Sequence, residues 1–398
     1  MKTLARLNLL TRLFIGIAVG ILIGWAAQDM ALLYPVMVLY ATFQALFGSL
    51  LTFSIPLVII GFIIPGITEI GKGAGKMLFV AVLFASVFTV SAGFFAYFAT
   101  SAFSGIVVDA APFALGEYAD PVGPAVSIAI APVMPVMTAL VFSFVVGVAL
   151  VNMDGESQIK KFFFEFQGII KSLIAKVIIP LLPVHISAIF ANIAYVGQAG
   201  DMAVAFLATF ILIIAMHIVF LLVVYSIAGS LFKKCPFRLL RKMLPSYMTA
   251  IGTQSSAATI PVNLVNVKRL GVKESVAEFV VPLCATINLP GSTMSIVACA
   301  IVVMHMYGMD VSLEIIAPFI FGLSVLMIAA PGVPGGAIVA AFGALEGALG
   351  FDAVHLAVMT ALYIAQDSLG TAVNVTSDGA ISMYINRLLG NKTLKDVV

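Results

Sequence analysis

Long apolar stretches separated by short polar segments run through the first half of the chain. Each stretch is long enough to cross the hydrocarbon core of a bilayer as a helix. Pro56 and Pro65 are candidate kinks in the second stretch, and Pro132 and Pro135 break up the fourth. The hydropathy pattern therefore predicts spans over about 10–27, 31–67, 75–103, 123–152, 166–196 and 202–231.

The second half, from about 235 to the end, has a different pattern. Its apolar stretches are interrupted by SSAATIPVN (255–263), NLPGST (288–293), APGVPGG (330–336) and AQDSLGTAVNVTSD (365–378). In the last of these, Asp367, Thr371, Asn374 and Asp378 are spaced to share one face of a helix. A charged face inside a membrane cannot point at lipid. One interpretation is a polar face that only holds helices together; the other is a binding face.

Charge composition supports a membrane protein that binds a cation or an ammonium group. The chain is 62% hydrophobic and 10% charged, whereas soluble proteins carry about 25% charged residues. No Lys or Arg occurs between Lys273 and Arg387, so Asp367 and Asp378 need some other positive partner, and a permeating cation or a substrate ammonium group would serve.

The basic residues also predict the orientation. They group at 2–12, 72–76, 160–176, 233–242, 268–273 and 387–395, while the intervening loops on the other side carry only acids. By the positive-inside rule, both termini are then cytoplasmic, as in a multi-pass protein of the plasma (inner) membrane.

Orientation constrains the topology of the second half. The basic groups at 233–242 and 268–273 lie on the same side, so the chain between them must enter the membrane and return. The acidic segments 305–314 and 346–352 require the same of 315–345. The prediction is an all-α polytopic fold with eight transmembrane helices and two re-entrant hairpins related as inverted repeats, the architecture of secondary transporters.

Four motifs in this half carry a family resemblance: TQSSAATIPV (253–262), NLPGS (288–292), GVPGG (332–336) and D-x-x-x-T-x-x-N-x-x-x-D (367–378). With them, the chain resembles the dicarboxylate/amino acid:cation symporter family, also called glutamate transporter homologues. The resemblance implies a homotrimer and an elevator mechanism. It implies a scaffold formed mainly by 1–231 and a core transport domain at 232–398. The third helix, at 75–103, and parts of the sixth are expected to belong to the transport domain.

The residues themselves suggest a substrate site. Ser255 and Ser256 expose hydroxyl and N–H groups at a helix break, which suits a carboxylate, and Asp367 suits an ammonium group. The resemblance adds Asn374 beside the carboxylate, Thr371 beside the substrate side chain, and a lid around Val333 and Gly335.

For cations, one carboxylate with unwound backbone carbonyls makes a hard oxygen site that fits Na⁺. The resemblance places one sodium site at Asp378 with carbonyls of Cys284, Asn288 and Asn374. It places a second at carbonyls of Thr286, Met327, Ile328 and Ala330. The family's third site lacks its oxygen donors here, where Pro290, Ala81, Phe84 and Ala85 stand, so we expect one or two Na⁺ ions.

Selectivity follows from a missing charge. Members that carry acidic substrates have an arginine where this chain has Gly370, and Gln254 stands where another arginine is common. Neither residue replaces a bidentate arginine, so the sequence predicts a small neutral amino acid of the serine, threonine or alanine class.

Other function classes remain to be compared. On the same fold, coupling to protons or transport of a dicarboxylate or another small organic anion is the alternative. An intramembrane aspartyl hydrolase is disfavoured because Asp367 and Asp378 lie roughly 16 Å apart along one helix. A passive channel would need polar residues along several helices. Here they cluster at four breaks near one depth, which favours an occluded site. Neither the cysteines nor the four histidines have metal-site spacing, and we expect no nucleic-acid partner.

Overall fold

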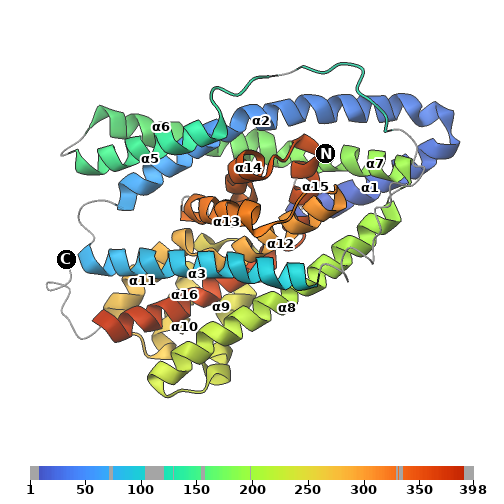
Figure 1. Ribbon diagram of the computed structural model, residues 1–398. Helices are drawn as coiled ribbons and strands as arrows, with labels where there is room; N and C mark the ends of the chain where they lie inside the picture. Colours follow the sequence, from blue (N-terminus) through green and yellow to red (C-terminus); the bar gives the residue numbers. More distant parts are fainter. Residues whose placement is uncertain are drawn as a thin grey trace.

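The computed structural model describes residues 9–70, 75–103, 121–128, 130–153, 157–197, 199–328, 330 and 335–389. Every regular element in these residues is a helix, which confirms the predicted all-α class. The helices lie in two layers (Figure 1).

The first layer contains the early helices. These are α1 (Leu9–Asp29), η2 (Ala31–Leu33), α2 (Tyr34–Ile70), α5 (Val136–Asn152), α6 (Gln158–Leu173) and α7 (Ile179–Val196). Helix α1 packs along α7, and α2 packs along both α5 and α7.

Glycines allow α1 and α7 to lie unusually close. Gly16, Gly20 and Gly24 repeat every four residues on one face of α1. A Cβ atom on these glycines would lie 2.6, 2.2 and 2.2 Å from carbonyl oxygens of α7. Small residues at this spacing are typical of tightly packed membrane helices, because they let backbones touch.

The prediction of a fourth span over 123–152 was wrong in its first half. Only α5 is helical, and the described residues from 121 to 135 are not. Pro121, Pro124, Pro132 and Pro135 explain this, because each lacks an N–H group and disfavours helix in the residue before it. The backbone of Val122 is instead held by the Asn192 amide of α7, at 2.9 and 3.0 Å.

The fifth span is longer than predicted. Helix α6 continues into α7 through a π-helical turn, η3 (Ile174–Ile178), so the helix runs on past Pro180 and Pro183. The wider turn accommodates the proline that follows it.

The second layer contains α3 and all helices from α8 onward. Their bounds are α3 (Gly75–Ala102), α8 (Ala199–Phe232), α9 (Pro236–Thr253), α10 (Ser256–Leu270), α11 (Glu274–Ile287), α12 (Pro290–Met306), α13 (Leu313–Ile328), α14 (Gly336–Leu349), α15 (Ala353–Ile364) and α16 (Asp367–Leu389). The predicted interruptions at 254–255, 288–289 and 365–366 are therefore helix breaks, and the last bends the chain by 62°.

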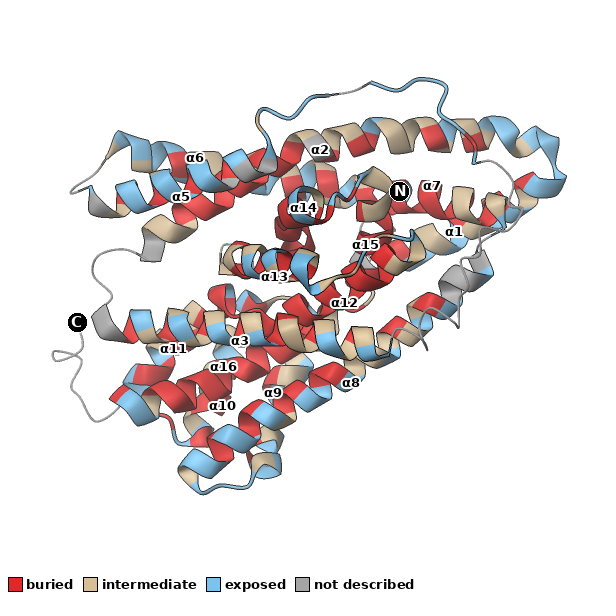
Figure 2. Ribbon diagram, in the orientation of Figure 1, coloured by how far each residue is buried: buried red, intermediate tan, exposed pale blue. Residues whose placement is uncertain are grey.

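Helices α12 and α16 form the centre of this layer. They pack against each other, and α3, α8, α9 and α11 pack around them. Figure 2 shows both helices buried over most of their length, whereas α8 exposes one face. The centre is also where polar residues gather, including Asp367, Asn374 and Asp378.

The outer surface of the helices is apolar. Among the described residues, six helices are long and apolar enough to cross a membrane, or seven if α15 and α16 count as one broken span. Exposed side chains such as Val145, Leu207 and Ile211 are large and hydrophobic. This surface fits lipid rather than water.

Candidate functional site

The break between α9 and α10 presents the two predicted serines. Gln254 ends α9 in the left-handed conformation (φ 53°), and Ser255 begins α10 by accepting a 3.3 Å hydrogen bond from the Ala258 N–H. Ser256 is 7% exposed at the first turn of α10. Both α9 and α10 pack against α16, so the serines lie at a helix N-terminus within the central helix group.

Asn374 binds the start of α12. Its Oδ1 accepts hydrogen bonds from the N–H groups of Gly291 (2.8 Å) and Ser292 (3.3 Å), and its Nδ2 donates to Ser292 Oγ at 2.9 Å. Asn374 therefore caps the broken helix that the NLPGST motif begins. The sequence interpretation did not include Ser292 in the site, although it belongs to that motif.

Gly370 also faces the start of α12. A Cβ atom at Gly370 would lie 3.3 Å from the Ser292 nitrogen, and one at Gly291 would lie 2.4 Å from the Gly370 carbonyl oxygen. These two glycines let α12 and α16 approach each other directly. A side chain at position 370 would begin beside Ser292.

Asp367 is buried and held from two sides. Its Oδ2 accepts a 2.8 Å hydrogen bond from the Gly335 N–H, and its Oδ1 accepts one of 2.8 Å from the Tyr363 hydroxyl. Gly335 precedes α14, so one residue of the expected lid touches the carboxylate expected to bind ammonium. Val333 lies outside the described residues, and Thr371 is buried one turn after Asp367.

Asp378 lies in an oxygen-rich group about three helical turns after Asp367. Its Oδ1 accepts a 2.8 Å hydrogen bond from Asn288 Nδ2. That nitrogen also lies 2.8 Å from Ser377 Oγ and 3.5 Å from the Asn374 carbonyl oxygen. The amide N–H groups of Asn288 are thus surrounded by a carboxylate, a hydroxyl and a carbonyl oxygen, the donor set that suits Na⁺.

The other predicted carbonyl ligands lie at helix ends. The Cys284 carbonyl accepts the Asn288 N–H at 2.9 Å where α11 ends. Helix α13 ends at Ile328, and the Ala330 N–H donates to the Met327 carbonyl at 3.3 Å. Thr286 is exposed near the end of α11, which packs against α13.

The positions expected to have lost a third cation site are apolar in space as well as in sequence. Ala81 and Ala85 are fully buried on α3, which packs along α12. The Phe84 ring packs at a tilt against the ring of Tyr384, with centroids 5.5 Å apart. Pro290 begins α12 and has no side-chain oxygen.

One histidine contacts the same region. His217 of α8 is buried and places Nε2 3.1 Å from the Gly291 carbonyl oxygen, which can only accept a hydrogen bond. Within the described residues, no group of three or more His, Cys, Asp or Glu side chains is placed to hold a metal ion.

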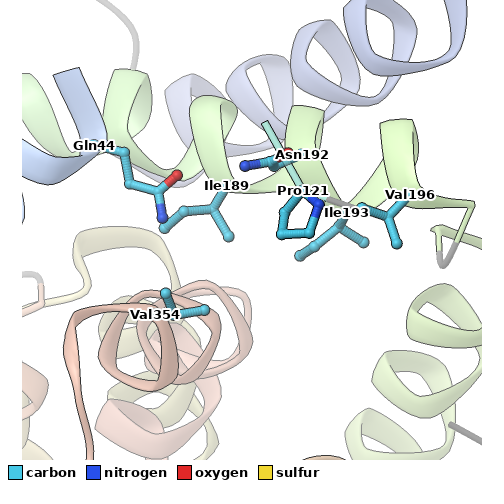
Figure 3. A pocket seen from close by; sticks show the side chains of 7 residues that line it. All are labelled: Gln44, Pro121, Ile189, Asn192, Ile193, Val196 and Val354. Carbon is cyan, nitrogen blue, oxygen red and sulfur yellow. The ribbon is translucent and has the colours of Figure 1, made fainter. Parts of the chain in front are cut away.

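A cavity of about 290 Å³ lies between the two layers, away from these residues. Figure 3 shows Gln44 of α2 and Val354 of α15 on opposite sides of it. The remaining lining residues are Pro121, Ile189, Asn192, Ile193 and Val196. None of the predicted site residues lines this cavity.

Two known proteins and one family profile are similar to this chain over much of its length. The serine/threonine transporter SstT of Acinetobacter baumannii (strain AYE) is 28% identical over 397 residues, covering 94% of this chain and 95% of that protein. The neutral amino acid transporter B(0) of Homo sapiens is 25% identical over 272 residues, covering 67% of this chain and 50% of that protein. A family profile described as the sodium:dicarboxylate symporter family matches residues 9–388. The chain therefore belongs to the sodium:dicarboxylate symporter family and is a sodium-coupled symporter, not an enzyme.

Proposed function

We propose that this symporter carries a small neutral amino acid, of the serine, threonine or alanine class, into the cell with Na⁺. The observation that carries the proposal is Gly370. It faces Ser292 at the α12–α16 contact, in the position where members with acidic substrates have an arginine. The chain has no Lys or Arg between Lys273 and Arg387, so nothing there would pair with a second carboxylate.

The amino acid's common groups have partners of the right chemistry. Asp367 is a buried carboxylate for the ammonium group, and two donors already orient it. The start of α10, with Ser255 and Ser256, offers hydroxyl and N–H donors for the carboxylate. The full alignment with a serine/threonine transporter supports this choice of substrate class.

Sodium binding is assigned to Asp378 and the oxygens around it. Na⁺ would take the place of the Asn288 N–H groups among Asp378 Oδ1, Ser377 Oγ and the Asn374 carbonyl. The carbonyls at the ends of α11 and α13 form the second proposed ion site. The apolar surroundings of Ala81 and Ala85 support one or two ions rather than three.

The two layers suggest the transport movement. We assign the layer with α1, α2, α5, α6 and α7 to a fixed, trimer-forming scaffold in the inner membrane. The layer centred on α12 and α16 would move as an elevator, together with α3, which packs along α12. Eight membrane spans with two re-entrant hairpins, α9–α10 and α13–α14, and cytoplasmic termini complete the proposal.

Binding of each of the twenty amino acids to the purified protein, with and without Na⁺, tests the substrate class. We expect serine, threonine or alanine to bind only with Na⁺, and aspartate and succinate not to bind. Uptake into proteoliposomes should follow a Na⁺ gradient. Uptake driven by a proton gradient without Na⁺, or preference for a dicarboxylate, would favour the alternative function.

Substitution at Gly370 tests whether the missing arginine at this position excludes acidic substrates. We expect Gly370→Arg to gain aspartate binding and lose serine binding, because the new guanidinium would lie beside Ser292. Gly370→Met is the matched control, since it adds similar bulk at the tight contact with α12 without the charge. Equal behaviour of the two variants toward aspartate would contradict the assignment.

A further inference from the structure

Asn263 connects the first hairpin to the proposed sodium site. It lies in α10 and is 1% exposed. Its Nδ2 lies 3.1 Å from the Val375 carbonyl oxygen and 3.4 Å from Asp378 Oδ2. The Val375 carbonyl and the ionised Asp378 carboxylate only accept hydrogen bonds, so the amide nitrogen faces them.

The other end of this amide has no partner. Asn263 Oδ1 is buried without a hydrogen bond in the described structure. A buried acceptor left unpaired lowers stability, so an amide kept only to join α10 to α16 would be a poor choice. The contribution of Asn263 therefore lies in what its nitrogen does at Asp378.

The Asp378 carboxylate is held by a different amide on each oxygen. Asn288 meets Oδ1, on the side of Ser377 and the Asn374 carbonyl, and Asn263 meets Oδ2. A donor on Oδ2 fixes the rotation of the carboxylate, so that Oδ1 stays directed at the oxygen group that would receive the ion.

We propose that Asn263 is a positioning residue for Na⁺ binding, which orients Asp378 from the first hairpin. This rests on the proposed assignment of Asp378 as a sodium ligand. It also provides a physical link between ion and substrate, because α10 begins at the serines proposed to bind the substrate carboxylate. Asn263 lies eight residues after Ser255, about 12 Å along one helix.

The test compares two buried asparagines on one helix. Asn266, three residues further along α10, is also 1% exposed, but its Nδ2 donates to Ser246 Oγ of α9 at 2.9 Å. We expect Asn263→Leu to raise the Na⁺ concentration needed for half-maximal thermal stabilisation by about 10-fold or more, the usual effect of losing a partner of a metal ligand. Asn266→Leu should leave that concentration within about twofold of the unmodified protein while also removing a buried amide.

A second measurement separates positioning from general damage. With saturating Na⁺, serine affinity of Asn263→Leu should stay within about twofold of normal, and at limiting Na⁺ it should fall by about 10-fold, because the two ligands are coupled. If Asn263→Leu does not fold, Asn263→Ala is used in the same comparison.

The outcomes distinguish this inference from the function it rests on. Asp378→Asn should raise the Na⁺ concentration needed for half-maximal thermal stabilisation at least as much as Asn263→Leu does. If it does, and the Asn263 variant responds to Na⁺ like the Asn266 variant, only the role of Asn263 is overturned. If Asp378→Asn still responds to Na⁺ normally, the ion-site assignment fails, and this inference fails with it.

Discussion

The helix pairs α1–α7 and α12–α16 both come into direct backbone contact at glycines, but the groups around the two contacts differ. Between α1 and α7, a Cβ atom on Gly20 would lie 2.2 Å from the Ser187 carbonyl oxygen. Between α12 and α16, a Cβ atom on Gly291 would lie 2.4 Å from the Gly370 carbonyl oxygen. Glycine thus brings the backbones together equally closely in both pairs.

The side chains around the two contacts differ. The α1–α7 contact is a seam of three glycines in register against backbone carbonyls of α7, and it gains stability from close packing. The α12–α16 contact carries Asn374, which caps α12, and lies near Asn288, whose Oδ1 is buried without a partner. Asn288 also donates to Asp378, so this unpaired acceptor belongs to a residue of the proposed ion site.

The largest expected effect comes from replacing Asp367, at the start of α16. Asp367→Asn should weaken amino-acid binding by at least 100-fold, about 3 kcal/mol, because a buried ammonium group would lose its charge partner. Binding is measured by titration of the proposed substrate at saturating Na⁺. Thermal stabilisation by Na⁺ should persist, since Asp378 is unchanged. Normal serine binding by this variant would show that the ammonium lies elsewhere.

The next largest effect is a loss of stability when the glycine seam between α1 and α7 is disrupted. Gly20→Ala should reduce stability by about 2–3 kcal/mol, because a Cβ atom would overlap the Ser187 carbonyl and force α1 from α7. Gly168→Ala in α6 is the control: nothing lies within 4 Å of its added Cβ, so better helix propensity should slightly stabilise it. The free energy of unfolding in detergent is the measurement. A loss of stability that is equal in both variants would rule out the seam as the cause.

The smallest expected effect comes from removing one of the two hydrogen bonds that hold Asp367. Tyr363→Phe removes the hydroxyl that donates to Asp367 at 2.8 Å, so substrate affinity should fall by roughly 10-fold, the value of one hydrogen bond to a charge. Tyr384→Phe loses a comparable bond to the Val224 carbonyl, of 2.6 Å, away from the site. We expect the control to change stability but not substrate affinity. The same affinity in both variants would argue against a role for Tyr363 in orienting Asp367.

Local pattern was sufficient for the helical class, the interruptions and the polar face. Runs of apolar residues predict membrane helices, and Ser, Pro and Gly clusters predict their breaks, because these signals lie within a few residues of each other. The error came between 121 and 135, where four prolines prevent a helix and the described residues are irregular. There, the Val122 N–H donates to the side chain of Asn192, 70 residues away, a contact that no local pattern along the chain indicates.

The sequence by itself determined which residues have the chemistry for binding: Asp367, Asn374 and Asp378 lie on one buried helix, with Gly370 in place of a charge. Only the tertiary structure decided how each one is engaged. Asn374 is bound by the start of α12, Asp367 by Tyr363 and Gly335, and Asp378 by amides from α10 and α11. Hydrogen bonds require donors and acceptors within about 3 Å, and across helix pairs that distance is set by packing, which no local pattern along the chain encodes.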